Sequence, residues 1–197
     1  MYDHDYATIQ IKRAVNPFRA FIKNFYLQNV LKHIQGPSID YGCGAGQLLE
    51  KLPYNSIGVE LNPILIDYLK NKGLDIIPAN NDLLFSEFKL FEINKFGTLI
   101  LSHVLEHFEN ANLVLVNLFK ITSLLNINRV IIVVPGIKGY LSDETHKTFI
   151  DYEYLKENNL LAVNGYSITK CEYFPVNLKF LSKLTKYHEL VLIYDKK

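Results

Sequence analysis

The chain has 197 residues, 49% of them hydrophobic, which favours one domain around one core over two small ones. Its 21 lysines and arginines nearly balance 20 aspartates and glutamates, so composition gives no support for nucleic acid or an anionic membrane as a partner. The N-terminal segment lacks a signal-peptide pattern, no apolar run is long enough to span a bilayer, and only two cysteines occur. We therefore expect a cytoplasmic protein without a disulfide framework.

Short apolar runs alternate with helical patterns, as in a parallel sheet covered on both faces. The sequence predicts a leading aromatic helix over residues 16–33, which stops at Gly36-Pro37. Helical patterns begin near Gly46, Pro63, Asp82 and Asn110. Strands are predicted at 38–41, 56–60, 75–78, 98–101 and 129–134. The last of these is apolar from Val130 onward, which places it near the middle of the sheet.

The end of the chain has a different pattern. A helix around 152–158 is followed by strand-like runs at 166–174 and 186–194, and the segment between the two runs is too short for a full crossover. Such neighbours pair antiparallel. The sequence therefore predicts an α/β fold, a doubly wound, mostly parallel seven-stranded sheet with an antiparallel edge hairpin, preceded by an N-terminal helix.

Three alternating glycines, Gly42, Gly44 and Gly46, lie between the first predicted strand and a predicted helix. Glycine allows positive φ angles and a close approach of backbone to ligand, and a helix start offers free N–H groups. The turn therefore indicates a site for a nucleoside-bearing cofactor. Gln47 replaces the third glycine of the dinucleotide fingerprint, which disfavours NAD, FAD and a nucleotide-dependent reductase. Cys43, inside the turn, is interpreted as a small residue in a tight place rather than a reactive thiol.

Polar residues follow two other predicted strands. Glu60 ends the second strand, eighteen positions after Gly42, where a carboxylate can accept hydrogen bonds from both hydroxyls of a ribose. Residues 102–107, Ser-His-Val-Leu-Glu-His, follow the fourth strand and bring polar groups to the carboxyl end of the sheet. Open α/β folds bind their ligands at this end.

The segments 39–46, 58–61, 102–107 and 130–135 together resemble the class I S-adenosylmethionine-dependent methyltransferases, specifically the small-molecule branch, and the resemblance extends over nearly the whole chain. It implies the Rossmann-like methyltransferase fold, S-adenosyl-L-methionine as cofactor and a small or carrier-bound acceptor. We expect one domain over 1–197, with a helical cap (1–36), a cofactor-binding core (37–135) and an acceptor-side part (136–197).

The resemblance also implies roles for matching positions. Asp40 and the glycines would surround the methionine portion and ribose, Glu60 would bind the ribose hydroxyls, and the turn at Ser102 and His103 would lie beside the cofactor. Asn80, Asn81 and Asp82 fall near the expected adenine contact, and the choice among them stays open. The implied cofactor-binding set is Asp40, Gly42, Cys43, Gly44, Gly46, Glu60, Leu61, Asn80, Asn81, Asp82, Ser102 and His103.

Two histidines are candidates for a general base. His146 lies in a polar loop after the fifth strand, where an imidazole could accept the proton of an acceptor hydroxyl or could only hold the loop by local hydrogen bonds. His107 could face the same pocket or pack at a helix start. Transfer to a neutral amine would need neither of them.

Two other functions are alternatives to methyl transfer. His103, Glu106 and His107 fit the inverted zinc-peptidase pattern H-x-x-E-H, but this short pattern follows a sheet strand in a chain that already carries a nucleoside turn, so we expect no metal. A binding or partner subunit that keeps the fold without turnover is the other alternative. The fold does not determine the acceptor, and the sequence predicts no oligomeric state.

Overall fold

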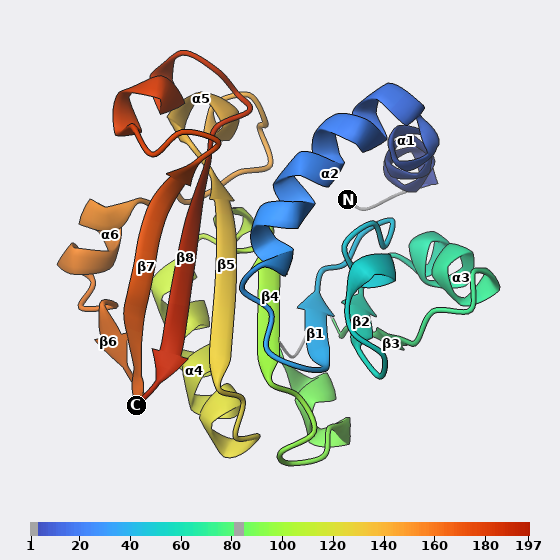
Figure 1. Ribbon diagram of the computed structural model, residues 1–197, viewed down its shortest axis with the longest axis horizontal. Coiled ribbons are helices and arrows are strands. Elements are labelled where there is room, and N and C mark those ends of the chain that lie inside the picture. Colours follow the sequence, from blue (N-terminus) through green and yellow to red (C-terminus); the bar gives the residue numbers. More distant parts are fainter. Residues whose placement is uncertain (1–3, 81–84) are drawn as a thin grey trace.

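The structure is a computed structural model that describes residues 4–80 and 85–197. It consists of a central sheet with helices on both faces (Figure 1). The described part of the chain forms eight strands in the order β3-β2-β1-β4-β5-β8-β7-β6, parallel from β3 to β5 and antiparallel beyond. The predicted doubly wound, mostly parallel fold with an antiparallel edge is confirmed. The strands are β1 Ser38–Tyr41, β2 Ile57–Glu60, β3 Ile76–Pro78, β4 Thr98–Ser102, β5 Arg129–Pro135, β6 Ala162–Val163, β7 Tyr166–Phe174 and β8 Glu189–Lys196.

The eighth strand, β6, is one that the sequence did not predict. Its two residues pair with the start of β7 across the turn Asn164-Gly165, where both residues have positive φ angles of 48° and 84°. Asn-Gly is the favoured pair for such a tight hairpin. Two residues are too few for a periodic pattern, so only the turn signalled this strand. The last strand, β8, also begins three residues later than predicted, at Glu189.

Two helices cover opposite faces of the sheet, α2 Pro17–Leu31 and α4 Ala111–Leu124. Along β5, Ile131 and Val133 pack with residues of α2, whereas the alternate residues of the strand belong to the core cluster that contains α4. Successive side chains of a strand point to opposite faces, and both faces are covered here. This explains why β5 is apolar along its length and confirms its place inside the sheet.

The prediction of a full helix after the glycine turn is wrong. Only a 3₁₀ helix, Leu49–Lys51, forms there, and Leu52 is extended with ψ of 158°. Leu52 precedes Pro53, and the ring of a proline disfavours the helical conformation in the residue before it. The helix predicted near Asp82 begins outside the described residues, and a 3₁₀ helix, Ser86–Leu90, follows the gap. The predicted helices at Pro63 and Asn110 form as α3 Pro63–Asn71 and α4.

The N-terminal cap consists of two helices, α1 His4–Val15 and α2, where the sequence predicted only the second. Ala7 of α1 packs with Ala45 of the glycine turn and Leu65 of α3. The cap therefore lies against the turn that follows β1. The remaining helices are α5 Ile137–Tyr140 and α6 Tyr152–Glu157. Within the described ranges, none of the helices combines the length and apolar character needed to cross a membrane.

Candidate functional site

The glycine turn lies where the strand order reverses, because β1 has β2 on one side and β4 on the other. Gly42, Gly44 and Gly46 all have positive φ angles, of 76°, 56° and 76°. A Cβ atom would come within 2.5 Å of Val104 at Gly42 and within 2.4 Å of Leu69 at Gly46, so a side chain at either position would require its neighbour to shift. At Gly44, none of the described residues beyond its two chain neighbours lies within 4 Å of the added atom. Gly44 is therefore the glycine with open space in front of it.

Glu60 connects the end of β2 to the glycine turn. Its Oε2 accepts a hydrogen bond from the N–H of Gly44 at 2.8 Å, and its Oε1 accepts from the N–H groups of Leu61 at 2.8 Å and Asn62 at 2.9 Å. A carboxylate has about four acceptor positions, two on each oxygen. One position on Oε2 is therefore left for a ligand hydroxyl. Accepting both hydroxyls of a ribose would require the Gly44 N–H to move away.

Asp40 lies buried in β1 just before this turn, and Cys43 lies half-buried within the turn. Asp40 is buried, and burial raises the pKa of its carboxyl from 3.8 to about 7, against the lowering effect of Lys23. Burial and the nearby carboxylates of Asp40 and Glu60 also raise the pKa of the Cys43 thiol. A thiol with a raised pKa stays protonated at neutral pH and is a poor nucleophile. This environment favours the interpretation of Cys43 as a small residue in a tight place.

The buried Asp40 predicts a specific pH dependence of stability. Because its pKa is higher in the folded than in the unfolded chain, the folded state loses stability as the pH rises from about 4 to about 7. Asp40→Asn cannot ionise, so its free energy of unfolding relative to wild type should increase by up to roughly 4 kcal/mol between pH 4 and pH 8. Urea unfolding across this range measures the difference. The exposed Asp67→Asn serves as control, and equal pH profiles for Asp40→Asn and wild type would contradict the prediction.

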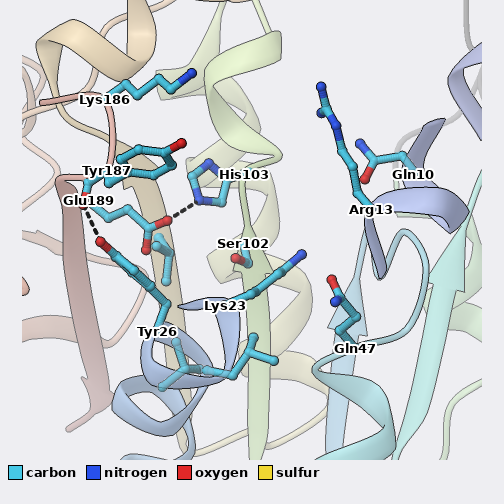
Figure 2. Close-up of a pocket in the computed structure, with 13 residues that line it drawn as sticks. Gln10, Arg13, Lys23, Tyr26, Gln47, Ser102, His103, Lys186, Tyr187 and Glu189 are labelled. Carbon is cyan, nitrogen blue, oxygen red and sulfur yellow. Dashed lines mark hydrogen bonds and ion pairs between the residues drawn. The ribbon is translucent and has the colours of Figure 1, made fainter. Parts of the chain in front are cut away.

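A cavity of about 500 Å³ opens beside the turn, between the N-terminal helices and the ends of β4, β5 and β8 (Figure 2). Its volume is within the range of small-molecule sites. Two predicted cofactor residues, Ser102 and His103, line it, together with Gln47 of the glycine-turn region. The full lining is Gln10, Arg13, Lys23, Tyr26, Leu27, Val30, Gln47, Ser102, His103, Val133, Lys186, Tyr187 and Glu189.

The cavity wall carries three cationic side chains that sequence reasoning missed, Arg13, Lys23 and Lys186. They come from α1, α2 and the loop before β8, and Figure 2 shows them around one space. Gln10 and Arg13 lie three positions apart on one face of α1, but this spacing gave no signal because the sequence predicted no helix there. Lys186, Tyr187 and Glu189 gave no such signal, because the sequence pattern assigned them to the last strand.

His103 is a cation in the cavity wall rather than a base. Its Nε2 lies 2.8 Å from Oε1 of Glu189 and its Nδ1 lies 3.3 Å from Oε1 of Glu106. Desolvation lowers the pKa of His103, but the two carboxylates outweigh that effect and raise the pKa to about 10. An imidazole that is protonated at neutral pH cannot accept another proton.

The same geometry disfavours the zinc-peptidase alternative. His103 has a left-handed backbone with φ of 57°, and only a 3₁₀ helix, Leu105–His107, follows it. The peptidase pattern requires His103 and His107 one turn apart on a single α-helix. Here His103 pairs with carboxylates, and His107 lies next to His146, with 4.9 Å between the ring centroids.

The other predicted site residues are placed as follows. The two candidate bases, His107 and His146, come together in the structure, but neither is among the residues that line the cavity. Asn80 follows β3, and its N–H donates to Glu87 at 3.4 Å. The alternatives Asn81 and Asp82 lie outside the described residues, so the adenine contact stays a prediction.

Comparison with solved structures identifies the fold. Over 98% of this chain and 100% of the other, the chain is similar to a SAM-dependent methyltransferase from Archaeoglobus fulgidus, with a TM-score of 0.71 and 18% identity. It is also similar to the magnesium protoporphyrin IX methyltransferase from Synechocystis PCC 6803 with bound SAH, with a TM-score of 0.64 and 16% identity over 100% and 97% of the two chains. A third similar structure is the PH0226 protein from Pyrococcus horikoshii OT3, with a TM-score of 0.58 and 18% identity over 94% and 93%.

These likenesses confirm the Rossmann-like methyltransferase fold that the sequence resemblance implied. No curated protein matches the chain. Residues 25–141, more than half of the chain, match the family model described as methionine biosynthesis protein MetW.

Proposed function

The chain belongs to the MetW family of methionine biosynthesis proteins, and on this basis we propose that it transfers a methyl group from S-adenosylmethionine to a small or carrier-bound acceptor with negative charge. The glycine turn carries the proposal. Open space in front of Gly44 and a spare acceptor position on Glu60 meet at the point where the strand order reverses. Ligands of open α/β sheets bind at such points.

The residues present suit the proposed cofactor. Glu60 would accept a hydrogen bond from a ribose hydroxyl, and the bare backbone of Gly44 would permit close approach of the nucleoside. Asp40 just before the turn and Ser102 at the end of β4 would contact the methionine portion. Asn80, or Asn81 or Asp82, would meet the adenine. When bound, S-adenosylmethionine supplies the electrophilic methyl carbon, so the chain itself supplies alignment and a shielded pocket.

The acceptor would occupy the cavity lined by Arg13, Lys23 and Lys186. These cations favour a carboxylate or phosphate group on the acceptor, because charge-assisted hydrogen bonds are the strong ones. Transfer would be an in-line displacement, in which a lone pair of the acceptor bonds to the methyl carbon as the carbon–sulfur bond breaks. A neutral amine acceptor would suit this cavity better than a hydroxyl, because a neutral amine needs no strong base and neither candidate base, His107 or His146, lines the cavity.

A product-release assay tests the proposal. We expect S-adenosylhomocysteine to form with acidic acceptors and not with their neutral analogues. Arg13→Gln should raise the KM for the acidic acceptor roughly tenfold, because it removes one charge-assisted contact. Lys12→Gln, an exposed neighbour outside the cavity lining, should not change it. Equal rates with acidic and neutral acceptors would contradict the assignment of charge, and cofactor binding without any turnover would favour the binding or partner subunit.

A further inference from the structure

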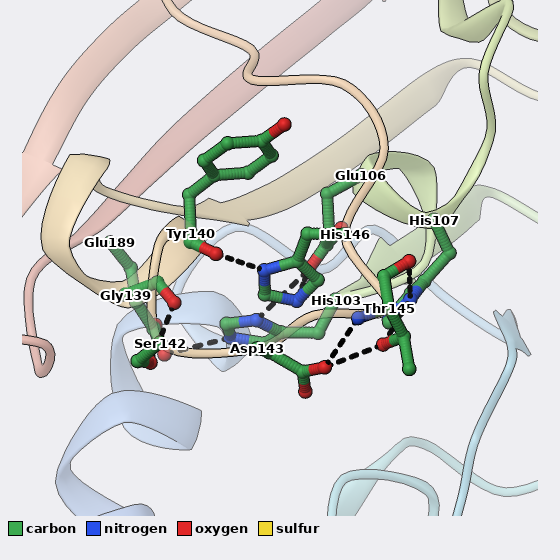
Figure 3. A network of polar contacts seen from close by, with 10 residues as sticks. All are labelled: His103, Glu106, His107, Gly139, Tyr140, Ser142, Asp143, Thr145, His146 and Glu189. Atoms are coloured by element: carbon green, nitrogen blue, oxygen red, sulfur yellow. Dashed lines mark hydrogen bonds and ion pairs between the residues drawn. The ribbon is translucent and has the colours of Figure 1, made fainter.

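Glu106, His107 and His146 form a cluster next to the cavity wall (Figure 3). Each offers one ligand atom, and the three atoms lie within 4.8 Å of one another. Glu106 and His107 belong to the 3₁₀ helix after β4, and His146 belongs to the loop after α5. The backbone joins the two segments, because the N–H groups of Lys147 and Thr148 both donate to the carbonyl of Glu106, at 2.8 and 3.1 Å.

Hydrogen bonds fix which nitrogen of His146 carries the proton. Nδ1 of His146 lies 2.9 Å from the backbone carbonyl oxygen of Tyr140. A carbonyl oxygen can only accept, so Nδ1 must donate. In the neutral ring, Nε2 then has a free lone pair, and it lies 3.9 Å from Oε1 of Glu106. The ring nitrogen that faces the carboxylate is therefore an acceptor.

Hydrogen bonds also orient His107. Its Nδ1 lies 3.1 Å from Oγ1 and 3.4 Å from the carbonyl oxygen of Thr145. The Thr145 hydroxyl already donates its hydrogen to Oδ1 of Asp143 at 2.6 Å, so both of these oxygens accept from His107. Nε2 of His107 is left with a lone pair. Histidines that bind metals are typically oriented by such a bond from the other nitrogen.

Glu106 supplies a buried carboxylate to the cluster. Its side chain is 1% exposed, and neither oxygen accepts a hydrogen bond from the residues that the structure describes. Oε1 lies at ion-pair distance from His103, but the charged group still lacks the hydrogen bonds that a buried carboxylate normally requires. Two imidazole lone pairs and one carboxylate thus lie together, and all three are donor groups that suit a metal cation.

We propose that Glu106, His107 and His146 bind a divalent transition-metal cation such as Zn²⁺ or Mn²⁺. Imidazole and carboxylate together suit these ions, and three protein ligands leave coordination positions open. Metal–ligand distances of about 2.1 Å place neighbouring ligand atoms roughly 3–3.5 Å apart, so the cluster would contract by about 1 Å on binding. The open positions would accept water or an oxygen of a bound molecule. The proposal does not depend on methyl transfer, because the site can be tested without cofactor or acceptor.

Calorimetric titration of the chelator-treated full chain with Zn²⁺, and separately with Mn²⁺, tests the site. We expect at least one of the two ions to bind at one equivalent. Glu106→Gln and His146→Gln should weaken binding at least 100-fold, because each removes one of three ligands. His33→Gln, a histidine outside the cluster, should bind like wild type. Thermal unfolding in the presence of chelator separates loss of the ligand from loss of the fold.

A further variant tests the orientation of His107 without touching a ligand. Thr145→Val removes the hydroxyl that accepts from Nδ1, and loss of such a supporting contact typically weakens metal binding about 10- to 100-fold. Failure of wild type to bind either ion at millimolar concentration would overturn the proposal. So would wild-type affinity in folded Glu106→Gln and His146→Gln.

Discussion

Replacing Glu60 with alanine should weaken binding of S-adenosylmethionine by roughly 10- to 100-fold. The variant removes the acceptor position on Oε2 that faces the proposed ribose, and a hydrogen bond to a charged group contributes about 1.5–3 kcal/mol. It also leaves three backbone N–H groups without their acceptor, those of Gly44, Leu61 and Asn62. We therefore expect the free energy of unfolding to fall by about 2–4 kcal/mol as well.

Two further variants separate these effects. Glu60→Gln keeps one carbonyl oxygen, so it should retain more stability than Glu60→Ala while still losing affinity. Glu153→Ala, an exposed acid of α6, should match wild type in both properties. Calorimetric titration gives the affinities and urea unfolding gives the stabilities. Wild-type affinity in folded Glu60→Ala would show that the ribose is not held at the end of β2.

Replacing Gly44 with alanine should lower cofactor affinity about tenfold or more with only a small loss of stability. Among the described residues beyond its chain neighbours, the added methyl group meets no atom within 4 Å, and we expect it to occupy part of the space proposed for the nucleoside. Overpacking of this kind costs about 1–3 kcal/mol in binding. The positive φ of 56° adds a stability cost of roughly 1 kcal/mol.

Gly36 provides a matched control for this variant. It also has a positive φ, of 68°, and nothing lies within 4 Å of an added Cβ, but it precedes β1 and is not part of the glycine turn. Gly36→Ala should therefore lose similar stability and keep wild-type affinity. Equal affinity losses in the two variants would mean that backbone strain, rather than contact with the ligand, explains the effect at Gly44.

The sheet was largely predictable from the sequence because the burial of a strand is visible in its own residues, as a short apolar run. Short apolar runs such as that of β5 mark buried strands, and the predicted limits of β1 to β5 agree with the structure within one residue at each end. The helix after Gly46 was mispredicted because Pro53 outweighed the helical pattern before it. The strand β6 was not predicted because its two residues are too few to show an alternation of apolar and polar side chains.

The candidate site divides in the same way. The glycines could be identified because a tight turn with positive φ angles favours glycine, and Glu60 could be identified because ligand-binding polar residues follow the ends of parallel strands. The cavity cations come from three separate elements, and only the folded chain brings Arg13, Lys23 and Lys186 to one wall. The protonated state of His103 depends on Glu189, eighty-six positions away. The partners of His107 and His146 were equally hidden, because Thr145 and Tyr140 act through oxygen atoms whose positions the sequence does not specify.

Titration of the wild-type chain with S-adenosylmethionine, and with S-adenosylhomocysteine, tests the central claim most directly. We predict that one equivalent of each ligand binds and that the two compete for one site at the glycine turn. The absence of measurable binding of either ligand at millimolar concentration, in a chain shown to be folded by its cooperative unfolding, would contradict the proposed cofactor.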